Sequence, residues 1–155
     1  MQRLWDIDIN QVTDEILESE LYNFLESINS DFPIPLNQKT DLREYVEKVI
    51  KFGEIVAFQE ENILKGLAIG YIENLKDNSA YISVVGVKKE FRGNGIGKKV
   101  VQKFIEICKE KNIKSVNLYT HKSNETAIKM YKALGFSEDL GNKERAQDVH
   151  FILQL

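Results

Sequence analysis

The sequence predicts a single α/β domain, residues 1–155, built on one mixed, mostly antiparallel sheet. Two observations carry this prediction. Residues 54–87 hold short β-branched runs separated by polar turns, which is typical of an antiparallel meander. Residues 81–120 follow as a strand, a glycine loop, a helix and a strand, and such a unit places its two strands side by side in parallel, joined by a right-handed crossover. At 155 residues, 43% of them apolar, the chain can bury one sizeable core.

The N-terminal half is expected to contain a strand, two helices and the first strands of the meander. In order these are a strand at 4–9, a helix at 11–28, a loop or lid at 29–40, a helix at 42–52, and strands at 54–60 and 63–73. The first strand alternates polar and apolar residues, and both helices carry apolar residues three and four apart. Asn10 or Thr13 can cap the first helix, and Thr40 or Asp41 the second. Pro33 and Pro35 favour a loop between them.

The C-terminal half continues with strands that alternate with helices. We expect a strand at 81–87, a loop at 88–94, a helix at 96–111, a strand at 115–120, a helix at 124–134, and strands at 136–140 and 148–154. Residues 81–87 are apolar on both faces, which suits a strand buried in the middle of a sheet. Gly135 is a natural end for the last helix. The predicted order is β-α-α-β-β-β-α-β-α-β-β, with seven strands and four helices.

The segment Arg92-Gly93-Asn94-Gly95-Ile96-Gly97-Lys98 has the composition of an anion-binding loop. Glycines let the backbone approach a phosphate closely, and the N–H groups that begin the next helix have no partner within the helix. Lys98 and the guanidinium group of Arg92 add positive charge. The spacing matches neither the dinucleotide fingerprint G-x-G-x-x-G nor the P-loop, which needs Ser or Thr where Lys99 stands.

The same loop resembles the R/Q-x-x-G-x-G/A signature of the GCN5-related N-acetyltransferase (GNAT) superfamily. Downstream, N-E-T-A-I-K-M-Y-K-A-L-G-F at 124–136 is similar to the second signature of that family, N-x-x-A-x-x-x-Y-x-x-x-G-F. The resemblance implies the GNAT acyl-CoA N-acyltransferase fold, in which strands 81–87 and 115–120 splay apart to admit acetyl-CoA. It also implies a set of cofactor-binding residues, namely Val85, Gly86, Val87, Arg92, Gly93, Asn94, Gly95, Ile96, Gly97, Lys98, Asn124 and Tyr131. Gly86 marks either a bulge of that family or close packing against a helix, and Asn124 can also cap the helix that follows it.

By the same resemblance, Tyr131 is the general acid that protonates the leaving thiolate; the alternative is an ordinary core aromatic. Ser83 stands where many members of the family carry an acidic base, and serine is a poor base without a partner. Glu73 at a strand end and His121 after a strand are the other candidates for the base or the acceptor site. Phe32, in the segment 31–36, is a candidate for a lid over the acceptor.

Composition limits the other classes of function. A net charge of −3 gives no support for nucleic-acid binding, and no apolar run is long enough for a membrane span. The first residues do not form a signal peptide, so we expect a cytoplasmic protein. Two distant histidines and the single Cys108, placed on the apolar stripe of a helix, predict no metal site.

Together these features predict an acetyl-CoA-dependent N-acetyltransferase acting on a primary amine of a small molecule or a protein. Two alternatives remain open: a catalytically weak acyl-CoA-binding module, motivated by Ser83, and a nucleotide-binding regulatory domain that uses the same anion loop. A homodimer is also left open.

Overall fold

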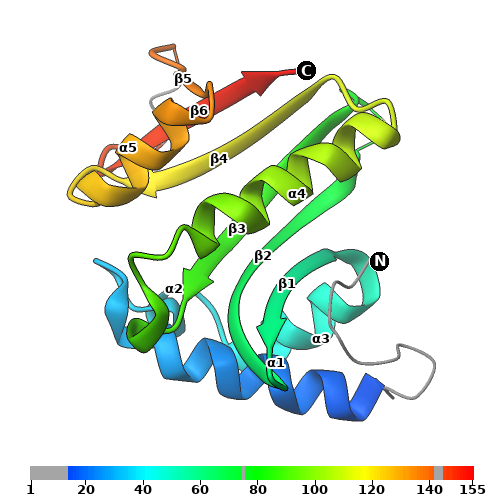
Figure 1. The fold of residues 1–155 in the computed structure, drawn as a ribbon. Coiled ribbons are helices and arrows are strands. Elements are labelled where there is room, and N and C mark those ends of the chain that lie inside the picture. The colour runs from blue at the N-terminus through cyan, green and yellow to red at the C-terminus, as the bar shows by residue number, and fades with distance from the viewer. Residues whose placement is uncertain (1–13, 75, 142–144) are drawn as a thin grey trace.

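The structure, a computed structural model, describes residues 14–74, 76–141 and 145–155, which form a six-stranded sheet with helices on both faces (Figure 1). The spatial order is β1-β2-β3-β4-β6-β5. The strands are β1 Glu54–Glu60, β2 Ile63–Asn74, β3 Ser79–Val87, β4 Ser115–His121, β5 Ser137–Glu138 and β6 Asp148–Gln154. Six of the seven expected strands are therefore confirmed, although the one expected at 136–140 is reduced to two residues. The strand expected at 4–9 and the caps Asn10 and Thr13 lie outside the described residues.

The helices are α1 Asp14–Ile28, α2 Leu36–Lys39, α3 Leu42–Phe52, α4 Ile96–Glu110 and α5 Glu125–Ala133. Asp41 caps α3, because its Oδ1 accepts hydrogen bonds from the backbone N–H of Arg43 at 2.9 Å and of Glu44 at 3.1 Å. The segment 29–40, expected as a loop or lid without regular structure, contains two short helical turns. These are a 3₁₀ turn, Asn29–Asp31, and the single turn of α2.

Two physical features explain the short helix α2. Pro35 precedes it with φ −53°, and the carbonyl of Pro35 accepts a hydrogen bond from the N–H of Gln38 at 3.0 Å. Leu36 is 8% exposed and anchors this turn to the core.

The sheet separates two hydrophobic clusters. Side chains of α1 and α3 pack on one face of the sheet, over β1, β2 and β3, and those of α4 and α5 pack on the other face, with α5 beside β4 and β6 (Figure 1). The fully buried members include Leu17, Leu21, Leu25, Val46, Leu67 and Ile69 on the first face, and Phe104, Ile107, Leu118 and Phe151 on the second. The apolar side of the amphipathic helix α4 packs against this second face of the sheet.

A β-bulge in β3 lies at Ser83. In the pairing of β2 with β3, Ile69 stands opposite Val84, but the next residue, Gly70, stands opposite Ile82, so Ser83 is the extra residue. Gly86 is in regular register opposite Leu67. A Cβ on Gly86 would collide with the side chain of Ile28 in α1, so close helix packing explains this glycine and the reading of Gly86 as a bulge was wrong.

Strands β3 and β4 separate beyond their first residues. Their parallel pairing runs from Ser79 opposite Ser115 to Ile82 opposite Leu118, whereas β4 continues along β6 until His121 stands opposite Asp148. The second half of β3 and the end of β4 therefore diverge, as Figure 1 shows. This divergence opens a gap inside the sheet.

Candidate active site

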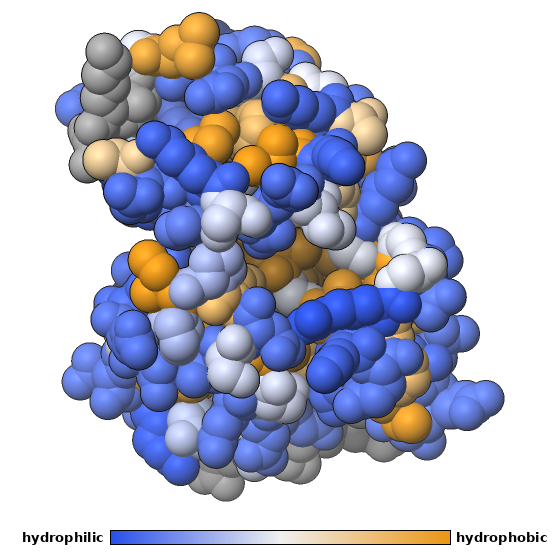
Figure 2. Space-filling view, turned by 90° about the vertical axis from the view of Figure 1, so that its left-hand side faces the viewer, coloured by the Kyte–Doolittle hydropathy of each residue, from blue (hydrophilic) through white to orange (hydrophobic). Residues whose placement is uncertain are grey.

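Two adjoining cavities occupy the gap between β3 and β4. The first, here called the loop cavity, has a volume of about 490 Å³ and is lined by the glycine loop, the end of β3 and the start of α5. The second, the inner cavity, has a volume of about 350 Å³ and is lined by segments 32–45, 81–85 and 118–121, by α5 and by Arg145 and Asp148. Both are bounded by Phe32, Val85, Asn124, Ala127 and Met130. Figure 2 shows a face of the molecule hollowed at mid-height, with apolar residues at the bottom of the hollow.

The glycine loop has the backbone of an anion cradle. Gly93 has φ +85° and Gly95 has φ +74°, and Gly95 is the left-handed N-cap residue of α4. Among the described residues, no side chain caps α4, so its first N–H groups remain available to a ligand. A Cβ on either glycine would meet nothing within 4 Å. Open space therefore lies beside the backbone of both glycines.

Arg92 does not present a free fork to this space. Its Nη2 lies 2.7 Å from Asp31 Oδ2, and its Nε donates a hydrogen bond to the carbonyl of Val87 at 3.1 Å. The arginine thereby ties the glycine loop to the end of β3 and to the 3₁₀ turn before Phe32. In this structure its side chain positions the loop, whereas the sequence suggested a direct phosphate contact.

The other predicted cofactor-binding residues fall into two groups. Those that line the loop cavity are Val85, Gly86, Val87, Arg92, Gly93, Gly95, Ile96, Gly97, Lys98 and Asn124. Asn94 is absent from this lining, and its Nδ2 donates to the carbonyl of Phe91 at 3.2 Å. Tyr131 lines the inner cavity.

Asn124 and Tyr131 are both positioned by α5. Asn124 is the N-cap residue, whose side-chain oxygen accepts a hydrogen bond from the N–H of Ala127 at 3.3 Å, and it also borders both cavities. Tyr131 is 5% exposed, with its ring 5.6 Å from that of Phe136 and 5.9 Å from that of Phe151. Burial raises the pKa of Tyr131 above its ordinary value of 10.0. Tyr131 is thus part of the core and of the cavity wall at once.

The three candidate bases, Ser83, His121 and Glu73, differ in position and in hydrogen-bond partners. The hydroxyl of Tyr45 donates to Ser83 Oγ at 2.8 Å, and both residues line the inner cavity. Burial raises the pKa of Tyr45, with a smaller opposing effect of the bond to Ser83, so the tyrosine keeps its proton. His121 also lines this cavity as the last residue of β4, but its Nδ1 accepts the backbone N–H of Ser123 at 3.1 Å. Glu73 lies in β2, and its side chain is outside the described part of the molecule.

The residues of the inner cavity that sequence reasoning missed include Tyr81, Tyr119, Arg145 and Asp148. The guanidinium of Arg145 lies 4.0 Å from the centre of the Tyr119 ring, and its Nη1 is 3.9 Å from Asp148 Oδ2. The alternation of residues along β6 predicts which side chains share a face of the sheet. It does not predict that one end of β6 borders the gap between β3 and β4. The sequence alone therefore carried little signal for this group.

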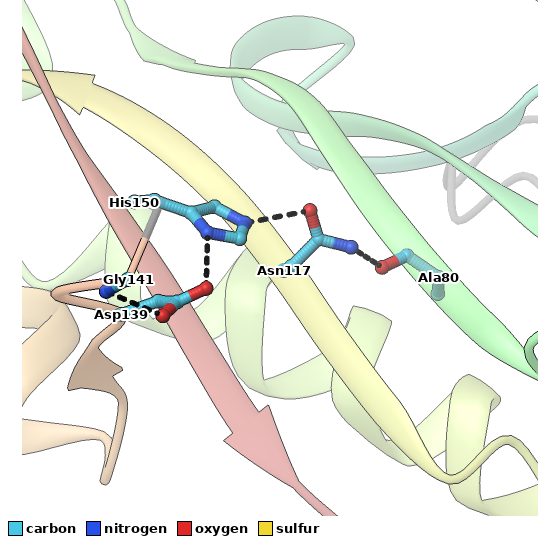
Figure 3. A network of polar contacts seen from close by, with 5 residues as sticks. All are labelled: Ala80, Asn117, Asp139, Gly141 and His150. Carbon is cyan, nitrogen blue, oxygen red and sulfur yellow. Dashed lines mark hydrogen bonds and ion pairs between the residues drawn. The ribbon is translucent and has the colours of Figure 1, made fainter. Parts of the chain in front are cut away.

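A polar network supports the wall formed by Tyr119. The ring of His150 stacks on Tyr119 with centres 4.5 Å apart. Figure 3 shows that His150 Nδ1 lies 3.3 Å from Asp139 Oδ2 and Nε2 lies 3.1 Å from Asn117 Oδ1. Asn117 Nδ2 donates to the carbonyl of Ala80 at 2.9 Å. The network joins β3, β4, β6 and the turn after β5, so it holds the aromatic wall in place.

Two further searches concern metals and membranes. In the part of the chain that the structure describes, no three His, Cys, Asp or Glu side chains gather as a metal site would need. Over those same residues, each helix is too short or too polar to cross a membrane.

Comparison with known proteins gives a consistent result. A model of the acetyltransferase (GNAT) family matches residues 21–136. Among curated relatives, thialysine N-epsilon-acetyltransferase of Bos taurus is 36% identical over 69 residues, which cover 44% of this chain and 40% of the relative. N-alpha-acetyltransferase 30 of Schizosaccharomyces pombe is 36% identical over 56 residues, covering 36% of this chain and 37% of the relative. The chain thus matches less than half of the length of either relative.

Solved structures agree on the fold. The PaiA N-acetyltransferase of Thermoplasma acidophilum, solved in complex with coenzyme A, superposes with a TM-score of 0.72 at 17% identity, covering 94% of this chain and 96% of that one. The family model spans three quarters of the sequence and includes both signatures, the glycine loop and the segment that carries Tyr131. The chain therefore belongs to the GNAT acetyltransferase family.

Proposed function

We propose that this protein transfers an acetyl group from acetyl-CoA to a primary amine of a small molecule or a protein. The observation that carries the proposal is the gap between β3 and β4 beyond Ile82 and Leu118. The glycine loop lines its loop cavity and Tyr131 lines its inner cavity. The loop cavity takes the cosubstrate and the inner cavity takes the acceptor.

The residues of the loop cavity fit the phosphates and the arm of acetyl-CoA. The uncapped start of α4 offers N–H groups and a partial positive charge, and Lys98 adds a full charge. Among the described residues, no strand pairs with β3 on the side of β4 beyond Ile82, so backbone groups around Val85 can pair with the amide groups of the pantetheine arm. Acetyl-CoA supplies a thioester whose carbonyl carbon is open to attack by a neutral amine.

Two groups of the protein assist the transfer in this proposal. Backbone N–H groups near Val85 stabilise negative charge on the carbonyl oxygen during attack. Tyr131 donates the proton that the departing thiolate needs, and because burial raises its pKa it remains an acid at any ordinary assay pH.

A second candidate is a catalytically weak acyl-CoA-binding module. The hydrogen bond from Tyr45 to Ser83 favours it, because the position where many relatives carry an acid is here a neutral pair with no group that readily takes a proton. The module would bind acetyl-CoA as tightly as an enzyme and turn it over slowly.

Ligand binding and turnover separate these functions. At 100 times its Kd, acetyl-CoA should stabilise the fold by about 2.7 kcal/mol, which corresponds to a rise in Tm of roughly 5–11 °C for a chain of this size. ATP and NAD serve as controls. If either one stabilises the protein and acetyl-CoA does not, the proposal is refuted in favour of a nucleotide-binding domain.

Release of the CoA thiol should then be followed with a panel of amines. The panel includes thialysine, lysine and peptides with free N-termini, because two relatives are named for such activities. Stabilisation by acetyl-CoA with no acceptor-dependent thiol release would favour the module.

A further inference from the structure

An amine acceptor needs a base in the inner cavity, since a lysine-type amine has a pKa of about 10.4 and arrives as an ammonium ion at neutral pH. Most of the described residues that line this cavity cannot take its proton. Lysine and arginine are already cations, and tyrosine phenols already carry their proton. For Tyr45 and Tyr131, burial raises the pKa further.

His121 is excluded as the base because one of its ring nitrogens already accepts a hydrogen bond and the other carries the ring proton. The backbone N–H of Ser123 donates to His121 Nδ1 at 3.1 Å, so Nδ1 acts as an acceptor and the neutral ring carries its proton on Nε2. The free edge of this imidazole is therefore a donor, which suits a contact with the acceptor better than removal of its proton.

One carboxylate then remains among the described lining residues of the inner cavity. We propose that Asp148 binds the ammonium group of the acceptor and takes its proton. Asp148 begins β6, stands opposite His121 in the register with β4, and has a side chain that is 16% exposed. This inference rests on the proposed acetyl transfer and adds to it the residue that makes the amine reactive.

The charges around Asp148 are compatible with this role. Arg145, in the turn before β6, approaches it at 3.9 Å, a distance too long for a hydrogen bond. His121 stands opposite it on β4, and Lys39 lines the same cavity from α2. An incoming ammonium can form the short contact that Arg145 does not make. Arg145 itself is held over Tyr119.

The proton and bond changes balance as follows. Asp148 accepts one proton from the ammonium, which leaves a neutral amine. The amine nitrogen bonds to the thioester carbon, the carbon–sulfur bond breaks, and the thiolate takes the proton of Tyr131. The second proton of the attacking nitrogen returns to Tyr131 through water, and Asp148 releases its proton to solvent. The products are an amide, the CoA thiol and one proton.

The test compares Asp148→Asn with Asp148→Glu and with Asp77→Asn, which makes the same change on an exposed turn residue. Binding of acetyl-CoA by calorimetry should be unchanged in all three. At pH 7, kcat/KM for the best amine of the panel should fall roughly 10²- to 10⁴-fold in Asp148→Asn. Asp148→Glu should restore part of it, and Asp77→Asn should match the wild type.

The pH profile distinguishes a base from a merely structural residue. As the pH approaches the pKa of the amine itself, free amine becomes abundant, so the Asp148→Asn rate should converge on the wild-type rate. A wild-type profile in Asp148→Asn, or an equal loss at every pH, overturns the role of Asp148. Failure of the wild-type protein to bind acetyl-CoA would instead refute the proposed function, so the two failures are distinct.

Discussion

The substitution Gly95→Ala tests whether the glycine loop holds phosphate. Gly95 has φ +74°, a left-handed conformation that costs a residue with a Cβ roughly 1–2 kcal/mol. The added methyl would meet no protein atom within 4 Å, so the folded chain suffers this backbone cost and no collision. At about 2–4 °C per kcal/mol, Tm should fall by roughly 2–8 °C.

The effect on binding should be separate from this strain. The methyl would occupy the space beside the first N–H groups of α4, and a phosphate pushed away from them loses at least one charge-assisted hydrogen bond. Such a bond contributes about 1.5–3 kcal/mol, so the Kd for CoA should rise roughly 10- to 150-fold.

Gly135→Ala is the matched control. Gly135 also has a left-handed backbone, with φ +98°, but it follows α5 and lines neither cavity. The Cβ would meet only the end of the Leu153 side chain, at 3.4 Å. Calorimetry with CoA and thermal unfolding should show that both variants lose stability and that only Gly95→Ala loses affinity. Equal CoA affinity in the two variants would refute the assignment of the phosphate site.

Three other predictions follow from the site and the core. Tyr131→Phe keeps the buried ring, so Tm and CoA affinity should hold while turnover falls roughly 10²- to 10⁴-fold; a wild-type turnover would make Tyr131 a core residue only. Phe32→Ala should raise the KM of acetyl-CoA as well as that of the acceptor, because Phe32 lines both cavities; a change confined to the acceptor would restore the simpler lid. Burial raises the pKa of the Cys108 thiol from 9.0 to about 12, so the unfolded thiol ionises first and urea denaturation should show stability falling above pH 9 by up to about 1.4 kcal/mol per pH unit. Cys108→Ala should lessen that fall, and a pH-independent stability would contradict the buried thiol.

The sequence predicted those features that depend on local backbone chemistry. The glycine loop could be predicted because glycine adopts left-handed conformations, such as those of Gly93 and Gly95, more readily than any other residue. The cap at Asn124 and the amphipathic face of α4 were readable for similar reasons, since each depends on residues within one or two turns.

Features that depend on the register of distant strands could not be predicted from the sequence. The bulge at Ser83 exists because of how β2 and β3 align, and the partner of Ser83 is Tyr45, 38 residues away. Asp148 enters the inner cavity because β4 leaves β3 and follows β6, which no pattern within 148–154 reveals. One of the two hydrogen bonds of Arg92 likewise joins it to Asp31, 61 positions away, so its guanidinium group seemed free in the sequence.

The divergence of β3 from β4 also bears on how the molecule avoids unwanted association. Beyond Ile82, no described strand pairs with the edge of β3 that faces β4, and an exposed edge is a template for pairing with other chains and for aggregation. Here the edge faces the interior of the gap, between segment 28–32 and the first turn of α5. Another polypeptide strand could pair with this edge only by entering the recess of about 490 Å³ that the glycine loop and α5 enclose with it. The recess therefore shields the strand edge from neighbouring proteins and leaves it accessible to a small molecule that enters the cavity.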